Sequence, residues 1–286
     1  MNQADEAGIS YAQRRRLGAE LSRLRRLAGI SGRDMARHIR ASQAHVSRVE
    51  AGKAVPTLPQ VRAWADAAEV SEDARPALVA LTEAALNEFD SWQDRDGTQL
   101  ATMQRDVAGL EAEAGLSRHF QPAMVPGLLQ TAEYARRVLA ITDVHGWGDH
   151  ASAVAARLER QEVLFKPGRR FEFLLTEAAV RLRLGPPHVM QGQTARIRAV
   201  MGLANVDIGI VPLAADAKVI PWCSFHLYDD LPDGQEAFVA LELPHGRLTV
   251  SDPAAVAVYA GQLDAIRQAA VYGADAEHLL DVVDAS

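Results

Sequence analysis

The chain has 286 residues, 48% of them hydrophobic, so it is long enough for two domains with cores of their own. A single cysteine, Cys223, excludes an internal disulfide and is typical of a reducing compartment. No stretch approaches the roughly 18 uninterrupted apolar residues of a membrane span. We therefore expect a soluble, cytoplasmic protein with no membrane partner.

Charge is unevenly distributed along the chain. Residues 1–70 contain 12 Lys and Arg against 7 Asp and Glu, a net charge of +5, whereas the whole chain carries −7 and the remaining 216 residues −12. A basic segment joined to an acidic body indicates that contact with a polyanion is confined to the N-terminal end. An ordinary helical domain with a solvated basic face would have the same charge. The local sequence pattern must therefore distinguish such a domain from one that binds a polyanion.

The first predicted helix begins after the basic run 14–16 and ends at Gly29, with Leu17, Leu21, Leu24 and Ala28 on one face. Two short helices follow within SGRDMARHIRASQAHVSRVEAGK (residues 31–53). Ser31 and Ser42 are N-cap residues, and Gly52 ends the second helix. A tight turn at residues 40–41 joins the pair, which predicts a helix-turn-helix.

Residues 17–70 resemble the lambda-repressor-like (XRE family) helix-turn-helix regulators. The resemblance is carried by Leu21, Leu24, Arg25, Gly29, Ile30, Ser31, Met35, Ala36, Ser42, Gln43, the segment VSRVE (46–50), Gly52, Lys53, Pro56 and Thr57. In that family the second helix of the pair enters the major groove of DNA with its N-terminus first. The resemblance therefore implies a double-stranded DNA operator, a homodimer on a roughly palindromic site, and base contacts from Gln43, Ala44, Ser47 and Arg48, with His45 at the border.

The chemistry of these residues agrees with such a placement. An Arg can fork onto guanine and a Gln onto adenine, each worth about 1–3 kcal/mol of discrimination. Arg33, Lys53 and the helix N-terminus at Ser42 are expected to meet phosphates, which fix the register without reading sequence. The chain departs from the family pattern at Arg40, which stands where the turn usually has Gly, a left-handed position that costs another residue on the order of 1 kcal/mol.

Two further helices complete the predicted N-terminal domain. Thr57 caps one that buries Val61 and Trp64, where the indole is expected to close the core, and the next begins after Ser71. We therefore predict an all-α, five-helix domain over residues 1–86. The polar, acidic segment NEFDSWQDRDGTQ (87–99) marks the boundary, and residues 87–104 are interpreted as a linker and connecting helix. Phe89 and Trp92 favour a linker that docks onto the body.

Residues 105–286 mix helical and alternating patterns, which predicts an α+β domain with one sheet of four or five strands covered by helices. The strand-like segments are 170–175, 206–211, 224–228, 237–243 and a short fifth at 247–250. The loop HGWGDH (145–150) contains two His and one Asp, but its Gly-flanked spacing fixes no geometry. No metal site is predicted.

From about Arg105 the chain resembles a domain of unknown function, described as antitoxin-like, that commonly follows an XRE module in actinobacterial regulators. The carriers are LEAE (110–113), VPGLLQTAEYAR (125–136), Arg157, Arg160, Gln161, TEAAVR (176–181) and the strand at 206–212. This resemblance implies that a small partner protein is encoded nearby.

No phosphate-binding loop, nucleophile elbow or HExxH helix is present, so we predict no enzyme, no catalytic residue and no cofactor. His226, Glu242, Glu177 and His188 would have to converge for catalysis. Trp222, His226 and Tyr228 follow a long loop at a strand edge, where they either contact a ligand or partner, or complete the core. Two hypotheses remain: a transcriptional regulator controlled by a partner protein or small ligand through a dimerising C-terminal domain, and an antitoxin-like protein that neutralises a small partner and autoregulates its operon.

Overall fold

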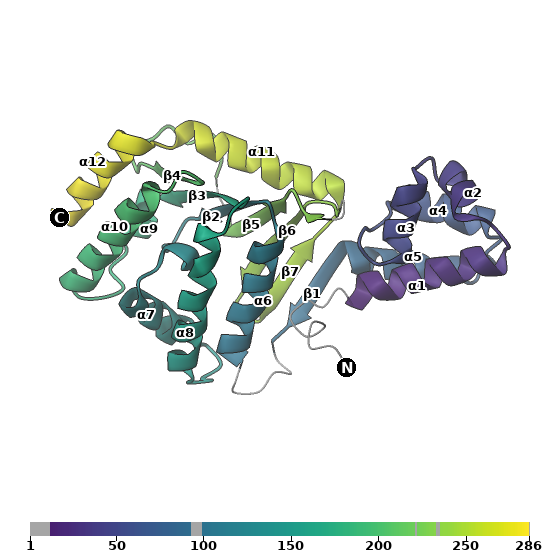
Figure 1. The fold of residues 1–286 in the computed structure, drawn as a ribbon, viewed down its shortest axis with the longest axis horizontal. Helices are drawn as coiled ribbons and strands as arrows, with labels where there is room; N and C mark the ends of the chain where they lie inside the picture. Colours follow the sequence, from purple (N-terminus) through teal and green to yellow (C-terminus); the bar gives the residue numbers. More distant parts are fainter. Residues whose placement is uncertain (1–11, 93–98, 221, 233–234, 286) are drawn as a thin grey trace.

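The computed structural model describes residues 12–92, 99–220, 222–232 and 235–285. The N-terminal domain consists of helices and lies to the right in Figure 1, beside a larger domain built on one sheet. Its described elements are α1 (Ala12–Leu27), α2 (Gly32–His38), α3 (Gln43–Glu50), α4 (Leu58–Ala67) and α5 (Arg75–Leu86).

The N-caps of α2, α3 and α4 are those that the sequence predicts, whereas α1 begins at Ala12, before the basic run 14–16, and α5 begins at Arg75, four residues after Ser71. The hydroxyls of Ser31, Ser42 and Thr57 each accept a hydrogen bond from the backbone N–H three residues on, which satisfies donors that a helix N-terminus leaves unpaired. Gly29 and Gly52 adopt positive φ after α1 and α3. The predictions about these N-caps and about the two glycines are thus confirmed.

The turn between α2 and α3 has the predicted strain. Arg40 has a φ of 54°, so the position that the resemblance assigns to Gly is indeed left-handed. The chain accepts this conformation because Ile39 and Val46, on either side of the turn, are both buried in the domain core.

The core of the N-terminal domain is apolar and closed by Trp64. Its indole N–H donates to the carbonyl of Leu21 at 3.2 Å, which pairs the polar atom of a fully buried side chain. The other large buried members are Leu17, Leu21, Met35, Ile39, Val46, Val49, Val55, Val61 and Leu78. Trp64 is therefore a core residue, as expected.

The C-terminal domain contains one seven-stranded sheet in the order β1-β7-β6-β5-β2-β3-β4. Strands β2, β3 and β4 run parallel, and the other neighbouring pairs are antiparallel. The strands are β1 (Asn87–Ser91), β2 (Leu116–Gln121), β3 (Arg170–Thr176), β4 (Val206–Val211), β5 (Phe225–Asp229), β6 (Phe238–Leu243) and β7 (Gly246–Val250).

Helices cover both faces of this sheet, so the predicted mixed architecture is present. In Figure 1, α11 runs along its upper side and α6, α7 and α8 lie below. The helices of the domain are α6 (Gln99–Glu113), η1 (Gly127–Leu129), α7 (Ala132–Thr142), α8 (His150–Arg160), η2 (Gln161–Phe165), α9 (Glu177–Arg181), α10 (Pro187–Met201), α11 (Pro253–Ala269) and α12 (Gly273–Asp284). None of the described helices combines the length and the hydropathy needed to cross a membrane.

The expected number of strands, four or five, was wrong, because two strands have sequences that do not look like strands. β1 lies in the polar segment interpreted as a linker, where its edge position exposes one side to solvent. β2, LSRHFQ, is central, yet Ser117, His119 and Gln121 alternate along it and are all buried. Polar residues on a buried face conceal the usual signal of a strand.

The predicted linker docks onto the body. Phe89 packs on the ring of His245 with centroids 5.2 Å apart, and the N–H of Trp92 donates to the His245 carbonyl at 3.0 Å. Residues 93–98 of the predicted linker lie outside the described residues.

The two domains are joined by more than the chain. α5 runs directly into β1, and the N–H of Ser251 donates to the carbonyl of Leu86 at 2.9 Å. Arg14 of α1 is buried at this junction, where its guanidinium bonds the Ser251 hydroxyl and lies 5.9 Å from the ring centroid of Phe238. The first helix is thereby attached to the sheet.

Candidate nucleic-acid interface

Helix α3 presents a short polar face at its N-terminal end. Val46 and Val49 are buried against the core, and Gln43, Ala44 and Ser47 on the other side are exposed. Arg48, one residue further, is half-buried. This arrangement follows from the period of the helix, because residues 43, 44, 47 and 48 share the side opposite to the two valines.

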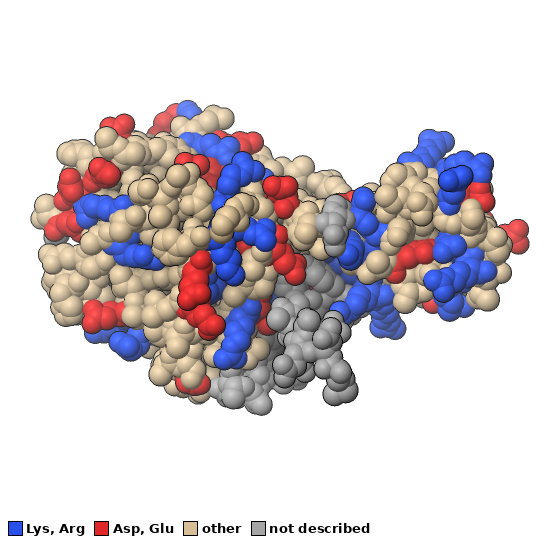
Figure 2. All heavy atoms as spheres, viewed as in Figure 1, with Lys and Arg blue, Asp and Glu red and all other residues tan. Residues whose placement is uncertain are grey.

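The N-termini of α2 and α3 lie close together beside this face. A Cβ built on Gly32, the first residue of α2, would lie 4.0 Å from Nε2 of Gln43. A helix N-terminus presents backbone N–H groups and partial positive charge, which suits phosphates. Arg33 in α2 and Lys53 after α3 are exposed. On the side seen in Figure 2, Lys and Arg cover much of this domain.

An ion pair that sequence reasoning missed fixes the far end of α3. Arg25 of α1 forks onto Glu50, with Nε–Oε1 2.5 Å and Nη2–Oε2 2.9 Å, and its Nη1 donates to the Ile30 carbonyl. Both side chains are about 85% buried, with 14% and 15% exposed, so this pair is screened less than a surface pair. Arg25 therefore holds the C-terminal end of α3 against α1.

His45 lies on a different side of α3 from the exposed residues. Its side chain is 12% exposed, and Nδ1 is 3.7 Å from Oε1 of Glu236, which precedes β6 in the other domain. The border residue of the predicted reading face thus contacts the C-terminal domain in this arrangement.

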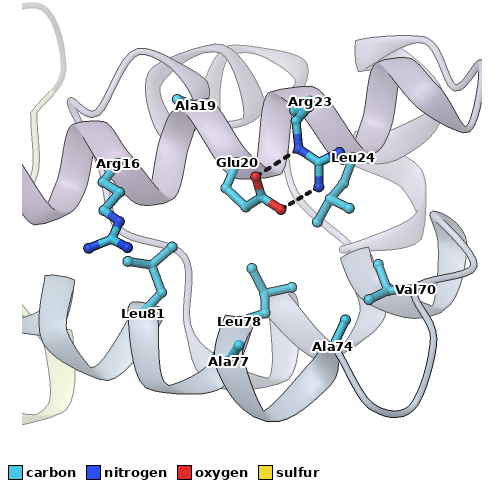
Figure 3. A pocket seen from close by; sticks show the side chains of 10 residues that line it. All are labelled: Arg16, Ala19, Glu20, Arg23, Leu24, Val70, Ala74, Ala77, Leu78 and Leu81. Carbon is cyan, nitrogen blue, oxygen red and sulfur yellow. Dashed lines mark hydrogen bonds and ion pairs between the residues drawn. The ribbon is translucent and has the colours of Figure 1, made fainter.

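A separate groove of about 490 Å³ runs between α1 and α5 (Figure 3). Leu78 and Leu81 point from α5 toward α1, Leu24 points from α1 toward α5, and the Glu20–Arg23 ion pair lies on the α1 side. None of its lining residues comes from α2 or α3, so the groove is distinct from the face formed by those helices.

The three residues predicted as a ligand or partner site do not form one surface. Trp222 is 84% exposed in the loop before β5. His226 and Tyr228 are buried on β5, where Tyr228 packs on Phe238 with ring centroids 5.1 Å apart. Burial lowers the pKa of His226 to about 4, so its imidazole is neutral at physiological pH. His226 and Glu242 both line a cavity of this domain.

The four residues weighed for catalysis are likewise divided. Glu177 bonds the Arg181 guanidinium at 2.6 Å and accepts the N–H of Leu213 at 2.8 Å, and neither it nor His188 lines the cavity of His226 and Glu242. Asp143, at the end of α7 before the HGWGDH loop, accepts bonds from the backbone of residues 147 and 148 and from the His150 ring. Among the described residues, no three His, Cys, Asp or Glu are placed to hold a metal ion.

Comparison with protein families agrees with both halves of this description. A helix-turn-helix domain model matches residues 16–78. A model described as a domain of unknown function, DUF5753, matches residues 104–281, more than half of the chain.

The chain belongs to the DUF5753 family. No curated protein and no solved structure matches it. The DUF5753 match begins within α6 and therefore leaves out β1, although that strand is part of the same sheet. This DUF5753 protein thus combines a helix-turn-helix domain with an α/β domain whose edge strand lies between the two family matches.

Proposed function

We propose that the protein is a sequence-specific transcriptional regulator that binds a double-stranded DNA operator as a homodimer. The exposed face of α3 carries this proposal, because Gln43, Ala44 and Ser47 are free of the core at the helix end that would enter the major groove. In this reading Arg48 and Gln43 contact base edges, Ala44 offers a methyl contact and Ser47 a hydroxyl. His45 stays at the border.

The surrounding residues support phosphate contacts. Arg33 and Lys53 are exposed at the two ends of the α2–α3 pair, and Ser42 caps the N-terminus of α3. The fork between Arg25 and Glu50 keeps α3 in place without the partner, so the helix need not be ordered on binding. We propose that the acidic C-terminal domain supplies dimerisation and control.

Selection of bound duplexes from a random pool by the full chain tests the proposal. We expect enrichment of a motif with two related half-sites about one helical turn apart, since a dimer presents two copies of α3. An absence of any enriched motif at low salt, with the protein folded, would refute sequence-specific binding.

A second candidate function, binding of a small partner protein in the manner of an antitoxin, is favoured by one loop. Between β4 and β5, Leu213, Ile220 and Trp222 are 67%, 68% and 84% exposed, and large apolar side chains exposed on one loop are typical of protein contacts. Co-expression with the small protein encoded beside the gene tests this function. We expect a stoichiometric complex that Trp222→Ser weakens, and a complex unaffected by that change would place the partner elsewhere.

A further inference from the structure

A cavity of about 390 Å³ lies in the DUF5753 domain between the sheet and helices α6, α7 and α8. The residues of the sheet that line the cavity lie on one face of the sheet. Asp90 of β1 and Glu242 of β6 both pair with Arg247 of β7, and His226 of β5 pairs with His119 of β2. The volume lies in the range of small-molecule sites.

The helical wall of the cavity contains two arginines in different electrostatic situations. Nε of Arg160 is 3.0 Å from Oε2 of the fully buried Glu111, so Arg160 has a carboxyl group within ion-pair distance. Arg157 instead donates from Nε to Gln104 at 3.0 Å and from Nη1 to Gln130 at 2.6 Å. These partners are neutral, and in the described part of the chain no carboxylate lies within ion-pair distance of Arg157.

This leaves Arg157 as an oriented cation with a spare donor. The two amide oxygens hold its plane, and its Nη2 has no hydrogen-bond partner among the described residues. Burial, and then repulsion by Arg160, lower the pKa of Arg157 to about 10, so the guanidinium still carries its charge at neutral pH. Arg157 is half-buried, and the carboxylates of Glu242 and Glu111 attract it from beyond ion-pair distance without pairing with it, so an anionic ligand in the cavity would give it a direct partner.

The rest of the helical wall is mainly apolar, although Asp106 of α6 also lines it. Its apolar residues are Leu100, Met103 and Val107 of α6, Val138 and Leu139 of α7, and Trp147 of the following loop. A ligand that fits both parts of this wall must combine one negative group with a hydrocarbon or ring body.

We infer that this cavity binds a small amphipathic carboxylate, whose charged group pairs with Arg157 and whose apolar body lies against α6 and α7. The site also touches the connection to the DNA-binding domain, because Asp90 of β1 and Trp92 line it, and β1 continues α5. An occupant therefore contacts the strand that anchors the helix-turn-helix domain. A role of this ligand as an effector that changes operator affinity rests on the proposed function, whereas binding of the ligand to the cavity does not.

The test uses the full-length protein and the fluorescent probe 1-anilinonaphthalene-8-sulfonate, which joins an anionic group to an apolar ring system. We expect saturable binding, displaced by octanoate at concentrations at least about tenfold lower than by 1-octanol or octylammonium, because only octanoate pairs with the guanidinium. Equal displacement by the three compounds overturns the inference.

Variants locate the site. Arg157→Gln should weaken octanoate binding about 10- to 100-fold, the loss typical of a charge-assisted bond. Met103→Trp should block binding by filling the apolar end while leaving Arg157 in place, and a circular dichroism melt checks that both variants fold. Arg137→Gln, an exposed arginine of α7, is the matched control and should bind as wild type. Wild-type affinity in folded Arg157→Gln and Met103→Trp overturns the inference.

A separate titration of operator DNA with and without octanoate distinguishes the two proposals. An unchanged operator affinity, with octanoate bound at Arg157, overturns the effector role and leaves the ligand site standing. Octanoate binding that depends on Arg157, in a protein with no affinity for any duplex, overturns only the proposed DNA-binding function.

Discussion

Arg48 and Lys53 lie five residues apart at the proposed DNA interface, but their chemistry assigns them different tasks. Arg48 is on the α3 face with Gln43 and Ala44, and Lys53 is exposed after the helix. Arg48→Ala should reduce discrimination at one base pair by about 1–3 kcal/mol, because only a base-edge contact carries sequence information. Lys53→Ala should weaken binding to all duplexes alike and lower the salt slope by about one.

The measurement is a binding titration against the selected operator, single-base variants of it and a random duplex, at several salt concentrations. Arg137→Ala, which removes the same charge from an exposed position of the other domain, should change neither specificity nor slope by a comparable amount. If Arg48→Ala and Lys53→Ala behave identically on operator and random DNA, the two roles are wrongly assigned.

Glu111 gives the C-terminal domain a distinctive dependence on pH. Burial raises the pKa of this carboxyl to about 7 in spite of the attraction of Arg160, so the folded protein binds a proton that the unfolded chain, with a pKa near 4.5, releases. Stability from this group is therefore fully present below about pH 4.5 and is lost as the pH rises through 7, by up to about 3 kcal/mol.

Glu111→Gln should abolish this component, so that the variant gains stability relative to wild type as the pH rises from about 5 to about 8. Denaturant unfolding at several pH values measures the difference. The comparison must be with wild type, because His226 also makes stability depend on pH. Burial lowers the pKa of His226, so this group destabilises the folded protein as the pH falls below about 6.5, whereas Glu111 destabilises it as the pH rises. Glu113→Gln, an exposed carboxylate on the same helix, is the control, and equal pH profiles for the two variants would contradict the prediction.

At the scale of elements, the close approach of α1 to α3 depends on Gly18. A Cβ at this position would lie 2.4 Å from the Val49 carbonyl oxygen, a backbone atom that cannot give way without moving α3. Gly18→Ala should therefore destabilise the N-terminal domain by about 1–3 kcal/mol, although alanine favours a helix. Because α3 would shift, operator affinity should fall as well.

Gly192 in α10 provides the matched control, since a Cβ there would meet nothing within 4 Å. Gly192→Ala should stabilise the protein by about 0.5–1 kcal/mol, the usual gain in a helix interior. Thermal unfolding measures the change in stability of each variant, which should be a loss for Gly18→Ala and a gain for Gly192→Ala. Stabilisation by Gly18→Ala would show that the helices do not approach so closely in solution.

Local signals predicted the elements well where a short segment determines its own conformation. The caps at Ser31 and Ser42, the positive φ of Arg40 and the strands β3 to β7 all follow from neighbouring residues. β1 and β2 do not, because an edge strand needs few apolar residues and β2 turns three polar side chains toward the buried cavity side of the sheet. Their assignment depends on partners far away in the sequence.

For the candidate sites too, features set by neighbouring residues could be predicted, and features set by residues distant in the sequence could not. The exposure of Gln43, Ala44 and Ser47 could be predicted because one helix sets it. The surroundings of Arg157 could not, since Gln104 and Gln130 come from other segments and meet Arg157 only in the fold. What the sequence did offer was the family resemblance, in which Arg157, Arg160 and Gln161 are among the carriers.

At the scale of the whole molecule, Arg14 connects the two domains. It is buried between Ser251 and Phe238, at the point where α5 passes into β1. Arg14→Ala removes a charge-assisted hydrogen bond worth about 1.5–3 kcal/mol. We therefore expect the amides of β1 to exchange with deuterium faster in the variant, whereas those of β3 in the sheet interior keep their wild-type rates.

Hydrogen exchange followed by mass spectrometry measures this effect. Arg15→Ala changes the neighbouring, exposed arginine of the same helix and should leave β1 exchange as in wild type. Exchange that increases equally in β1 and β3 for Arg14→Ala would indicate global destabilisation and not a loosened junction.

The position of β1 outside both family matches determines where the chain can be cut to obtain a well-behaved C-terminal fragment. The backbone of β1 covers the whole length of β7, from Gly246 to Val250. A fragment that starts at Gln104 would lack β1, so the backbone N–H and C=O groups of β7 would be unpaired. An exposed edge strand of this kind pairs readily with strands of other molecules. Fragments cut at the family boundary should therefore form domain-swapped or aggregated species, whereas a cut before Asn87 should yield a monodisperse body.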